Sequence, residues 1–580
     1  MLRPGRFGAV GAFLSDAGSI VCPKMASLTK KVINGRPYYY LRETARVGGR
    51  SKVVKTTYLG RAEDLLARLS EARGEPRAVV VRSFGAVAAA LSVARELGVV
   101  EAIDAACPNA LSVSVGQLIG LAAINRAVSP RSKRQLADWH ARTALARLEP
   151  LPAKALSSQR FWDAMDRLDE ASIARAEEAI VARAVERFGI ALDTLIYDTT
   201  NFATFVDSAN ARNQITRRGH AKGGRRDLRL LGLALALARD GGVPLAHHPY
   251  EGNLPDAREF PRALEILAER LQALGAQPAQ LTLVFDKGNN SKANQALADE
   301  LGLRCVGSLV GAHHPELLAL PRSAYRQLTD IEGTHAHRAT KEINGRERVV
   351  LVTYSEQFAQ KQRRSFAQTL SKARRQLYEL KGIVERGKHR MDESKLESRI
   401  EEILAPRWLK EVVVVDADLQ TSSFSFRTDQ TALGRLVRRE FGKRILFCDR
   451  PEWSDEEIVA AYRSQAEVEN AFRQMKDPDF GAFEPIFHWT DQKQRVHAFY
   501  CTIALTIIAL INRSLHQAGI DLGPKLAIRL LSEIHETTLI YPAAGGRQGR
   551  PRARTQLAEI DHTQRRLYDA LDLAQLTATV

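Results

Sequence analysis

The spacing of apolar and polar residues divides this chain into β-rich, helical and mixed segments. Residues 27–59 alternate β-branched and aromatic runs with Gly-containing turns, which predicts a small antiparallel sheet. Residues 83–189 carry Ala and Leu at helical spacing and predict a helical domain. The next segment predicts strands at 192–197, 228–238 and 243–247, then a helix with Phe260, Leu264, Leu267 and Leu271 on one side, then a strand at 280–285.

Two of these predicted strands end in a carboxylate. Asp198 follows the first strand and Asp286 follows the fourth. A third acid, Glu469, lies inside a predicted helix that begins at the capping box of Ser454 and Glu457 and ends before a proline. Three strands, a helix and a strand, with acids after the first and fourth strands, is the order of a ribonuclease-H-like core. We therefore expect an α/β fold with a ribonuclease-H-like catalytic core.

The helix around Glu469 aligns several polar side chains. An α-helix turns about 100° per residue, so Tyr462, Gln465 and Lys476 fall within about 40° of Glu469 on one continuous helix. The rival acid, Glu467, points about 160° away from that face. We therefore expect Glu469 to be the third acid of the site.

A large insertion is expected between the second and third acids. Asp286 and Glu469 are 183 positions apart, far more than a helix connection needs. The pattern predicts a hairpin at 341–354, a charged helical stretch at 356–404, and strands at 412–415, 421–426 and 445–447. The expected organisation is a leader (1–24, with Met25 as the expected start of translation), a small β-rich basic module (25–80), a helical DNA-binding domain (81–190), the first half of the catalytic core (191–312), a β-rich and helical insertion (313–450), the second half of the core (451–520) and a C-terminal tail (521–580).

Charge and cysteine usage narrow the class of protein. The formal net charge is +17 and the sequence pI is about 9.7, which favours a polyanionic partner, with nucleic acid the first expectation. The five cysteines form no Cys-x-x-Cys pair, so neither a disulfide framework nor a zinc knuckle is indicated, and a reducing cytoplasm fits. The apolar run 498–511 is shorter than the roughly 20 residues of a membrane span, so we expect a buried core helix and no membrane.

Three carboxylates from distant segments suit a metal-dependent phosphoryl-transfer site. Two Mg²⁺ ions about 3.5–4 Å apart can activate a nucleophile and stabilise the leaving oxygen, and hard cations prefer carboxylate oxygens. We expect Asp198, Asp286 and Glu469 to be both catalytic and metal-binding, with two Mg²⁺ ions and with Mn²⁺ as a substitute. Taken singly, each aspartate is more often a capping or turn carboxylate. Asp198 as the nucleophile of a phosphatase is another reading, although residues 199–206 offer no second acid.

Basic and aromatic side chains near these acids are candidates for DNA contact. On the helix of Glu469, Lys476 and Tyr462 would hold a phosphate and a displaced base beside the metal ions. The ordinary alternatives are a lysine on the surface and a tyrosine packed in the core. The candidate DNA-binding residues are Tyr462, Gln465, Lys476, Arg463, Arg473, Lys222 and Arg226.

In combination these motifs resemble a bacterial DDE transposase of the insertion-sequence-four group, in the subgroup with a long β-rich insertion. The resemblance covers about residues 25–512. The matching segments are 197–202, 219–222, 226–228, 251–253, 285–288 and the helix 462–476, which is similar to the group signature of Tyr, two residues, Arg, three residues, Glu, six residues and Lys. The resemblance implies cut-and-paste transposition: cleavage of double-stranded DNA at inverted-repeat ends, strand transfer into target DNA, and a homodimer in a synaptic complex. It also implies a bacterial, nucleoid-associated location in the cytoplasm.

One departure from the signature affects the expected chemistry. Gln465 stands where the group has Arg, and Arg463 lies two positions earlier on another side of the helix. In the group this Arg and the Lys grip transposon-end DNA, and some relatives release the element through a DNA hairpin. A hairpin step is therefore less expected here than metal-dependent cleavage. The alternative function is a DNA-binding relative of a transposase that has lost catalysis.

Overall fold

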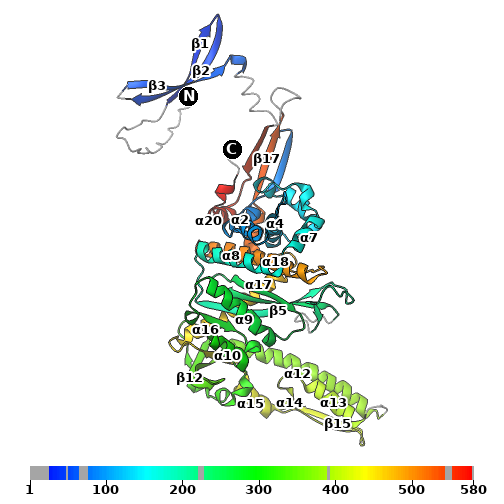
Figure 1. Ribbon diagram of the computed structural model, residues 1–580. Helices are drawn as coiled ribbons and strands as arrows, with labels where there is room; N and C mark the ends of the chain where they lie inside the picture. Colours follow the sequence, from blue (N-terminus) through cyan, green and yellow to red (C-terminus); the bar gives the residue numbers. More distant parts are fainter. Residues whose placement is uncertain are drawn as a thin grey trace, which may run out of the picture. The chain divides into compact units, whose positions relative to one another are not determined.

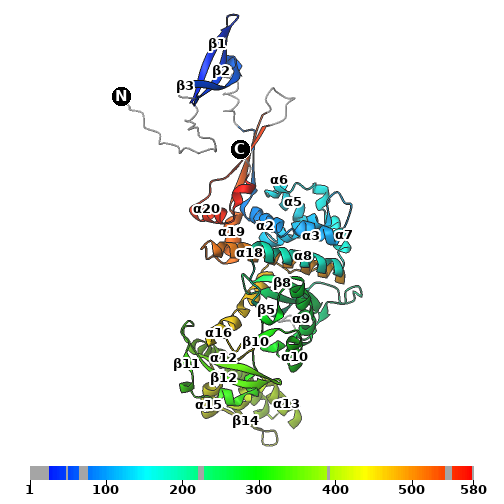
Figure 2. The same cartoon turned by 60° about the vertical axis from the view of Figure 1, so that its left-hand side comes forward.

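The computed structural model describes residues 25–47, 50–64, 76–219, 227–387, 392–542 and 552–577, and these form two compact units (Figures 1 and 2). The terminal unit is drawn from Met1–Arg82, Glu536–Ala558 and Ala578–Val580, and the main unit from Ser83–His535 and Glu559–Thr577. Each unit is built on its own sheets. Segments from both ends of the chain therefore share the terminal unit.

The terminal unit contains two three-stranded sheets. The first has the order β1-β2-β3 and is antiparallel, with β1 at Met25–Ile33, β2 at Arg36–Val47 and β3 at Arg50–Gly60. Asn34 and Gly35 join β1 to β2 at φ 49° and 75°, as a type I′ hairpin turn requires. The second sheet has the order β18-β17-β4, with β4 at Ala78–Ser83, β17 at His535–Tyr541 and β18 at Arg552–Leu557.

The C-terminal segment differs from the tail that we expected at 521–580. It forms α19 (Pro524–Ser532), strands β17 and β18, and α20 (His562–Ala570). Residues 543–551, between β17 and β18, lie outside the described residues. The flanking segments were missed because each strand is short and pairs with its partner only in the folded chain.

A ten-stranded sheet is the centre of the main unit. On one side of the sheet, an antiparallel group consists of β5 (Thr194–Thr204), β7 (Arg229–Ala238) and β8 (Val243–Glu251), with the short β6 (Arg217–Arg218) also paired to β7. On the other side of β5, β9 (Thr282–Phe285) and β10 (Arg304–Ser308) run parallel to it in the order β5-β9-β10. The predicted order of three strands, a helix and a strand is therefore the observed order. Every residue of β7 is buried, as expected of a strand covered on both faces.

Helices cover both faces of this sheet (Figure 2). On one face lie α9 (Asp256–Ala273) and α10 (Lys292–Glu300), which connect successive strands. On the other face lie α16 (Asp455–Arg463) against β9 and β10, and α17 (Gln465–Met475) against β5. The last two helices come from the far side of the insertion in sequence. The sheet thus joins the two halves of the predicted core.

The helical domain is built around a long helix from the second half of the chain. It contains α2 (Gly85–Glu96), α3 (Val99–Ala106), α4 (Val115–Val128), α5 (Leu136–Ala141), α6 (Leu145–Leu148), α7 (Ser158–Arg167) and α8 (Glu170–Phe188). Helix α18 (Asp491–Gln517) packs against α2, α4, α7 and α8. In the part of the chain that the structure describes, α18 alone is long and apolar enough to cross a membrane, and most of it is buried within the protein, as an all-round apolar helix requires.

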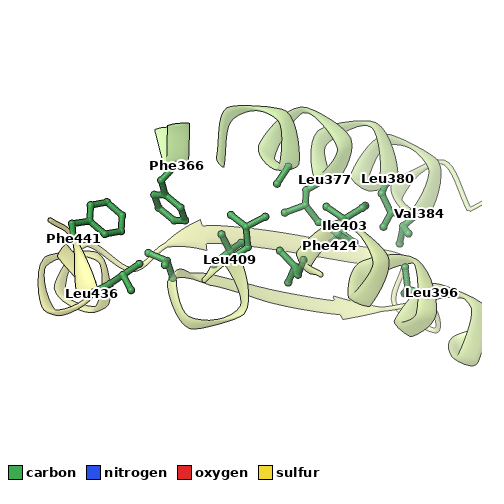
Figure 3. Close-up of a cluster of buried hydrophobic side chains, with 14 of the residues drawn as sticks. Phe366, Leu377, Leu380, Val384, Leu396, Ile403, Leu409, Phe424, Leu436 and Phe441 are labelled. Atoms are coloured by element: carbon green, nitrogen blue, oxygen red, sulfur yellow. The ribbon is translucent and has the colours of Figure 1, made fainter. Parts of the chain in front are cut away.

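The insertion contributes strands to the central sheet as well as a separate hydrophobic core. Strands β11 (Arg326–Gln327), β12 (Thr334–Ile343), β13 (Arg346–Ser355) and β16 (Lys443–Cys448) extend the sheet beyond β10. Helices α12 (Glu356–Glu385), α13 (Glu393–Leu404), α14 (Leu409–Val412) and α15 (Gln430–Glu440) pack with the hairpin of β14 (Val413–Asp418) and β15 (Ser423–Thr428). Figure 3 shows the side chains of this core.

Leu377 of α12 lies at the centre of the insertion core, where its side chain is fully buried (Figure 3). Leu377→Ala should destabilise the insertion by about 2–5 kcal/mol because it leaves a cavity. Glu379→Ala, at an exposed position of the same helix, should change stability by less than about 0.5 kcal/mol. Hydrogen exchange of the α12 amides checks both values. Equal protection in the two variants would contradict this packing.

Candidate active site

Asp198 and Asp286 lie at level positions on two neighbouring parallel strands: Asp198 lies inside β5, which continues to Thr204 and so runs past the predicted end at 197, whereas Asp286 directly follows β9. β5 and β9 pair in register up to Ile196 and Val284, and each aspartate follows its last paired residue by two positions. Neighbouring strands are about 4.8 Å apart, so the two backbones are level at these positions. Both aspartates are partly exposed. The parallel register thus brings together the two acids that the strand pattern predicted.

Both carboxylates point to the face of the sheet that α16 and α17 cover. Successive residues of a strand point to opposite faces. Tyr197 and Phe285, one position before each aspartate, both pack on Phe260 of α9, with ring centroids 5.0 and 5.2 Å apart. The aspartates therefore point away from α9.

Asp286 is held by two hydroxyl groups from neighbouring elements. The Tyr462 hydroxyl of α16 and the Ser308 hydroxyl of β10 each donate to Asp286 Oδ1 over 3.3 Å. Burial raises the pKa of Tyr462, which keeps its hydroxyl a donor. The Arg444 guanidinium of β16 lies 5.1 Å from the centre of the Tyr462 ring. We did not predict Arg444, because only the pairing of β16 into the sheet brings it here.

Lys476, directly after α17, is bound to the strand of Asp198. Its Nζ donates to Thr200 Oγ1 over 2.7 Å and lies 5.5 Å from the centre of the Phe202 ring. Thr200 and Phe202 follow Asp198 at alternate positions, so all three share one face of β5. The positive charge of Lys476 therefore lies on the same face of β5 as the Asp198 carboxylate.

The helix that carries Tyr462 and Lys476 is interrupted, which corrects our expectation of one continuous helix. α16 ends at Arg463 and α17 begins at Gln465. At Ser464 the backbone N–H donates to both Ala460 and Ala461 carbonyls, and the hydroxyl donates to the Ala461 carbonyl over 2.5 Å. Such back-bonding by serine competes with regular helix bonds. The single helical wheel therefore does not hold across Ser464, although Glu469 and Lys476 still share α17 and its end.

Glu469 lies on an exposed part of α17. Helix α17 runs in the same direction as β5, because Glu467 near its start is close to Gly242 in the β7–β8 turn whereas Lys476 at its end contacts Thr200. Glu469 precedes Lys476 by seven residues, about two turns or roughly 10 Å. That distance corresponds to about three strand residues, so Glu469 is at about the height of Asp198 along β5.

The other predicted DNA-binding residues that the structure describes do not contact Asp198 or Asp286. Arg463 donates to Thr334 Oγ1 of β12 over 2.7 Å, and burial lowers its pKa. Arg473 donates to Asn470 of the same helix over 2.7 Å. The Gln465 side-chain nitrogen is buried with no hydrogen-bond partner. The structure therefore brings neither arginine to the two aspartates. Lys222 and Arg226 lie outside the described residues.

The oxygen ligands at this site fit a hard divalent cation in their chemistry. Two aspartates and a glutamate are the ligand types that Mg²⁺ prefers. Among the residues that the structure describes, however, no three His, Cys, Asp or Glu side chains are grouped closely enough to hold a metal ion. The fold brings Asp198 and Asp286 to neighbouring positions on one face of the sheet, and the Glu469 side chain would have to approach them for a three-ligand site.

A second cluster of ionisable groups lies beside the α9 face of the sheet. His247 and Arg270 both contact the buried Glu177 carboxylate of α8. His248 Nε2 lies 3.5 Å from Glu259 Oε1 of α9. The sequence around this His pair has no carboxylate at a spacing typical of a metal site, and the carboxylates of the cluster come instead from helices α8 and α9. The cluster joins α8, β8 and α9 and is not a three-ligand metal group.

Comparisons with known proteins give weak structural matches only. No family model and no curated protein matches the sequence. Among solved structures, the chain is similar to a piggyBac transposase synaptic complex with hairpin DNA, at 9% identity over 76% of this chain and 79% of that one, with a TM-score of 0.36. It is also similar to a Mos1 transposase paired-end complex with the left transposon end, at 14% identity over 32% of this chain and 62% of that one, with a TM-score of 0.15. The function proposed below therefore rests on this chain's own geometry.

Glu259 gives the main unit a predicted pH dependence. Burial raises the pKa of Glu259 from 4.5 to about 7, against the opposing charge of Arg262. Because the folded-state pKa is raised, the stability that this group contributes is present below about pH 4.5 and lost as the pH rises through about 7. Glu259→Gln should therefore raise the melting temperature at about pH 8 and leave it nearly unchanged at about pH 4.5.

The control for this prediction is Glu265→Gln, which alters an exposed acid on the same helix. Its melting temperature should follow that of the unchanged protein at both pH values. A Glu259→Gln variant that is less stable at about pH 8 than the unchanged protein would show that the buried carboxylate is well satisfied in its charged form.

Proposed function

We propose that this protein is a DNA transposase that cleaves transposon ends and transfers the cut strands to target DNA. The observation that carries the proposal is the parallel pairing of β5 and β9, which brings Asp198 and Asp286 to neighbouring positions on the face of the sheet that α16 and α17 cover. The strand order β8-β7-β5-β9-β10 supports a ribonuclease-H-like core, interrupted after β10 by the insertion. The resemblance of 462–476 to the insertion-sequence-four signature supports the same class.

In this proposal Asp198, Asp286 and Glu469 hold two Mg²⁺ ions, for which Mn²⁺ can substitute. The ions, when bound, polarise the scissile phosphate and favour the oxyanion form of the attacking water or 3′-hydroxyl. Tyr462 and Ser308 orient Asp286 through their hydroxyl groups. Lys476 sets positive charge along β5 beside Asp198, where it would bind a DNA phosphate.

The basic chain supports double-stranded DNA as the partner. With 84 Lys and Arg against 67 Asp and Glu, binding is expected to release counterions from the DNA backbone. By its resemblance to the insertion-sequence-four group, the protein would bind two inverted-repeat ends as a homodimer, in the bacterial cytoplasm and associated with the nucleoid.

A DNA-binding relative without catalysis is the second candidate function. Two observations favour it: Gln465 replaces the signature Arg and leaves its side-chain nitrogen buried without a partner, and the described residues contain no closed three-ligand metal group. This candidate predicts sequence-specific DNA binding that does not lead to cleavage under any metal condition.

The test is cleavage of a plasmid that carries the DNA flanking the gene. The unchanged protein should cut at two inverted ends with Mg²⁺ or Mn²⁺. Three variants each remove one metal ligand: Asp198→Asn, Asp286→Asn and Glu469→Gln. Each should lower the cleavage rate at least about 100-fold. The affinity for the transposon ends should stay within a few-fold, because none of these variants removes a side chain that contacts DNA.

The matched control is Glu467→Gln on the same helix, which should cleave at the unchanged rate because Glu467 lies toward the β7–β8 turn. A variant at Glu469 that still cleaves would remove this residue from the site, and loss of cleavage in Glu467→Gln would assign the third carboxylate to Glu467. Tight binding without cuts in the unchanged protein would select the second candidate function.

A further inference from the structure

A cavity of about 750 Å³ opens in the main unit beside the helical domain. Its lining comes from the end of α4, the basic loop at 130–132, the start of α7, the segment after β5, and the connection from α17 to α18 at 478–490. This volume is in the range of sites for small organic ligands. We call it the aromatic pocket, for the side chains at its opening.

Large aromatic side chains are exposed at the aromatic pocket. Trp162, Phe487 and Trp489 line it and are 43%, 58% and 72% exposed. Phe487 also stacks on Phe205, which is 50% exposed, with ring centroids 5.3 Å apart. Soluble proteins seldom leave several large aromatic rings exposed together unless a ligand or partner covers them.

The pocket lining is strongly basic. Its two carboxylates already have partners within the chain, because Asp166 pairs with Lys493 and Glu484 Oε1 accepts a hydrogen bond from the Ala203 N–H over 2.7 Å. The six Lys and Arg residues of the lining are Arg126, Arg131, Lys133, Arg134, Arg212 and Lys493. The excess of positive charge favours an anionic occupant and argues against an apolar peptide.

Lys133 is a buried amine whose charged form is disfavoured in the absence of a counter-ion. Its Nζ lies 3.2 Å from His488 Nε2 and 3.1 Å from the Tyr500 hydroxyl, and none of the carboxylates that the structure describes forms an ion pair with it. Burial and the charge of Arg126 lower the pKa of Lys133 to about 7. A nearby phosphate would favour the charged form, so an anionic ligand would offset this effect of burial.

Strand β5 joins this pocket to the candidate active site. Asp198 and Thr204 lie on the same strand six residues apart, which is about 20 Å along a strand. Phe205 follows and stacks at the edge of the pocket, and its N–H donates to the Ile486 carbonyl over 2.9 Å. The same length of B-form DNA contains about six base pairs. One DNA molecule can therefore reach both places.

We propose that the aromatic pocket binds an unpaired nucleotide of the DNA substrate, about six base pairs from the phosphate at the carboxylates. The base would stack on Trp489, Phe487 or Trp162, since aromatic rings bind unpaired bases of any sequence. Arg131 and Arg134, both exposed, would bind its phosphates together with Lys133. This inference rests on the proposed function, because it takes the substrate to be DNA.

The experiment compares three labelled DNAs in buffer with EDTA, so that no cleavage intervenes: a blunt duplex, the same duplex with a short single-stranded overhang, and single-stranded oligothymidylate. The unchanged protein should bind the overhang duplex more tightly than the blunt one. Trp489→Ala should weaken binding of the overhang and single-stranded DNAs roughly 10-fold or more and change blunt-duplex binding less than about twofold. The exposed side chain allows this change without loss of folding, which the melting temperature checks.

The matched control is Tyr378→Ala, which removes another exposed aromatic ring, on α12 of the insertion, and should leave all three affinities unchanged. Equal losses on blunt and overhang DNA in Trp489→Ala would overturn the inference, because the pocket would then contact only duplex. A Trp489→Ala variant that keeps the unchanged protein's preference for the overhang duplex would also overturn the inference. In either case plasmid cleavage by the unchanged protein would still uphold the proposed function. Absence of binding to all three DNAs would contradict both proposals.

Discussion

The parallel pairing of β5 with β9 is the constraint on which the site depends. It sets Asp198 and Asp286 on neighbouring strands at equal height. If the two carboxylates were separated by the spacing of neighbouring strands, about 5 Å, they would repel by about 1 kcal/mol in water and about 3 kcal/mol at an effective dielectric constant of about 20. The hydroxyl donors of Tyr462 and Ser308 offset part of this repulsion. A divalent cation would offset the rest, so the backbone register itself creates a place for positive charge.

Most of the core could be predicted from the sequence because its signals are local. The apolar strands before Asp198 and Asp286, and the capping box before α16, are visible in short windows, and the structure has a strand or helix at each place. The first strand is longer than predicted, because β5 continues past Asp198 to Thr204 while it pairs with β7. The interruption at Ser464 was not predicted, because one hydroxyl bonding back to a carbonyl leaves the apolar spacing on both sides intact. Arg444 and Ser308 near Tyr462 were also missed, since only the pairing of distant strands brings them there.

The two faces of the sheet carry different kinds of residues: buried structural contacts lie beside one face, and the candidate site lies on the other. Beside the α9 face, the buried contacts of Glu177 with His247 and Arg270 join helices to β8. On the α16 and α17 face, carboxylates remain partly exposed. The same strand, β5, carries the first aspartate and leads to the exposed aromatic rings of the pocket. One buried strand thus connects the first aspartate with the aromatic pocket.

Localised hydroxyl-radical cleavage tests most directly whether β5, β9 and α17 together form a divalent-metal site. Fe²⁺ would replace Mg²⁺, ascorbate and peroxide would generate radicals at the ion, and mass spectrometry would locate the cuts. The account predicts cuts in the chain near Asp198, Asp286 and Glu469, suppressed by excess Mg²⁺ and lost in Asp198→Asn. Cuts at the two aspartates without α17 would remove Glu469 from the site. Cuts elsewhere in the chain, unaffected by Mg²⁺, would contradict the metal site altogether.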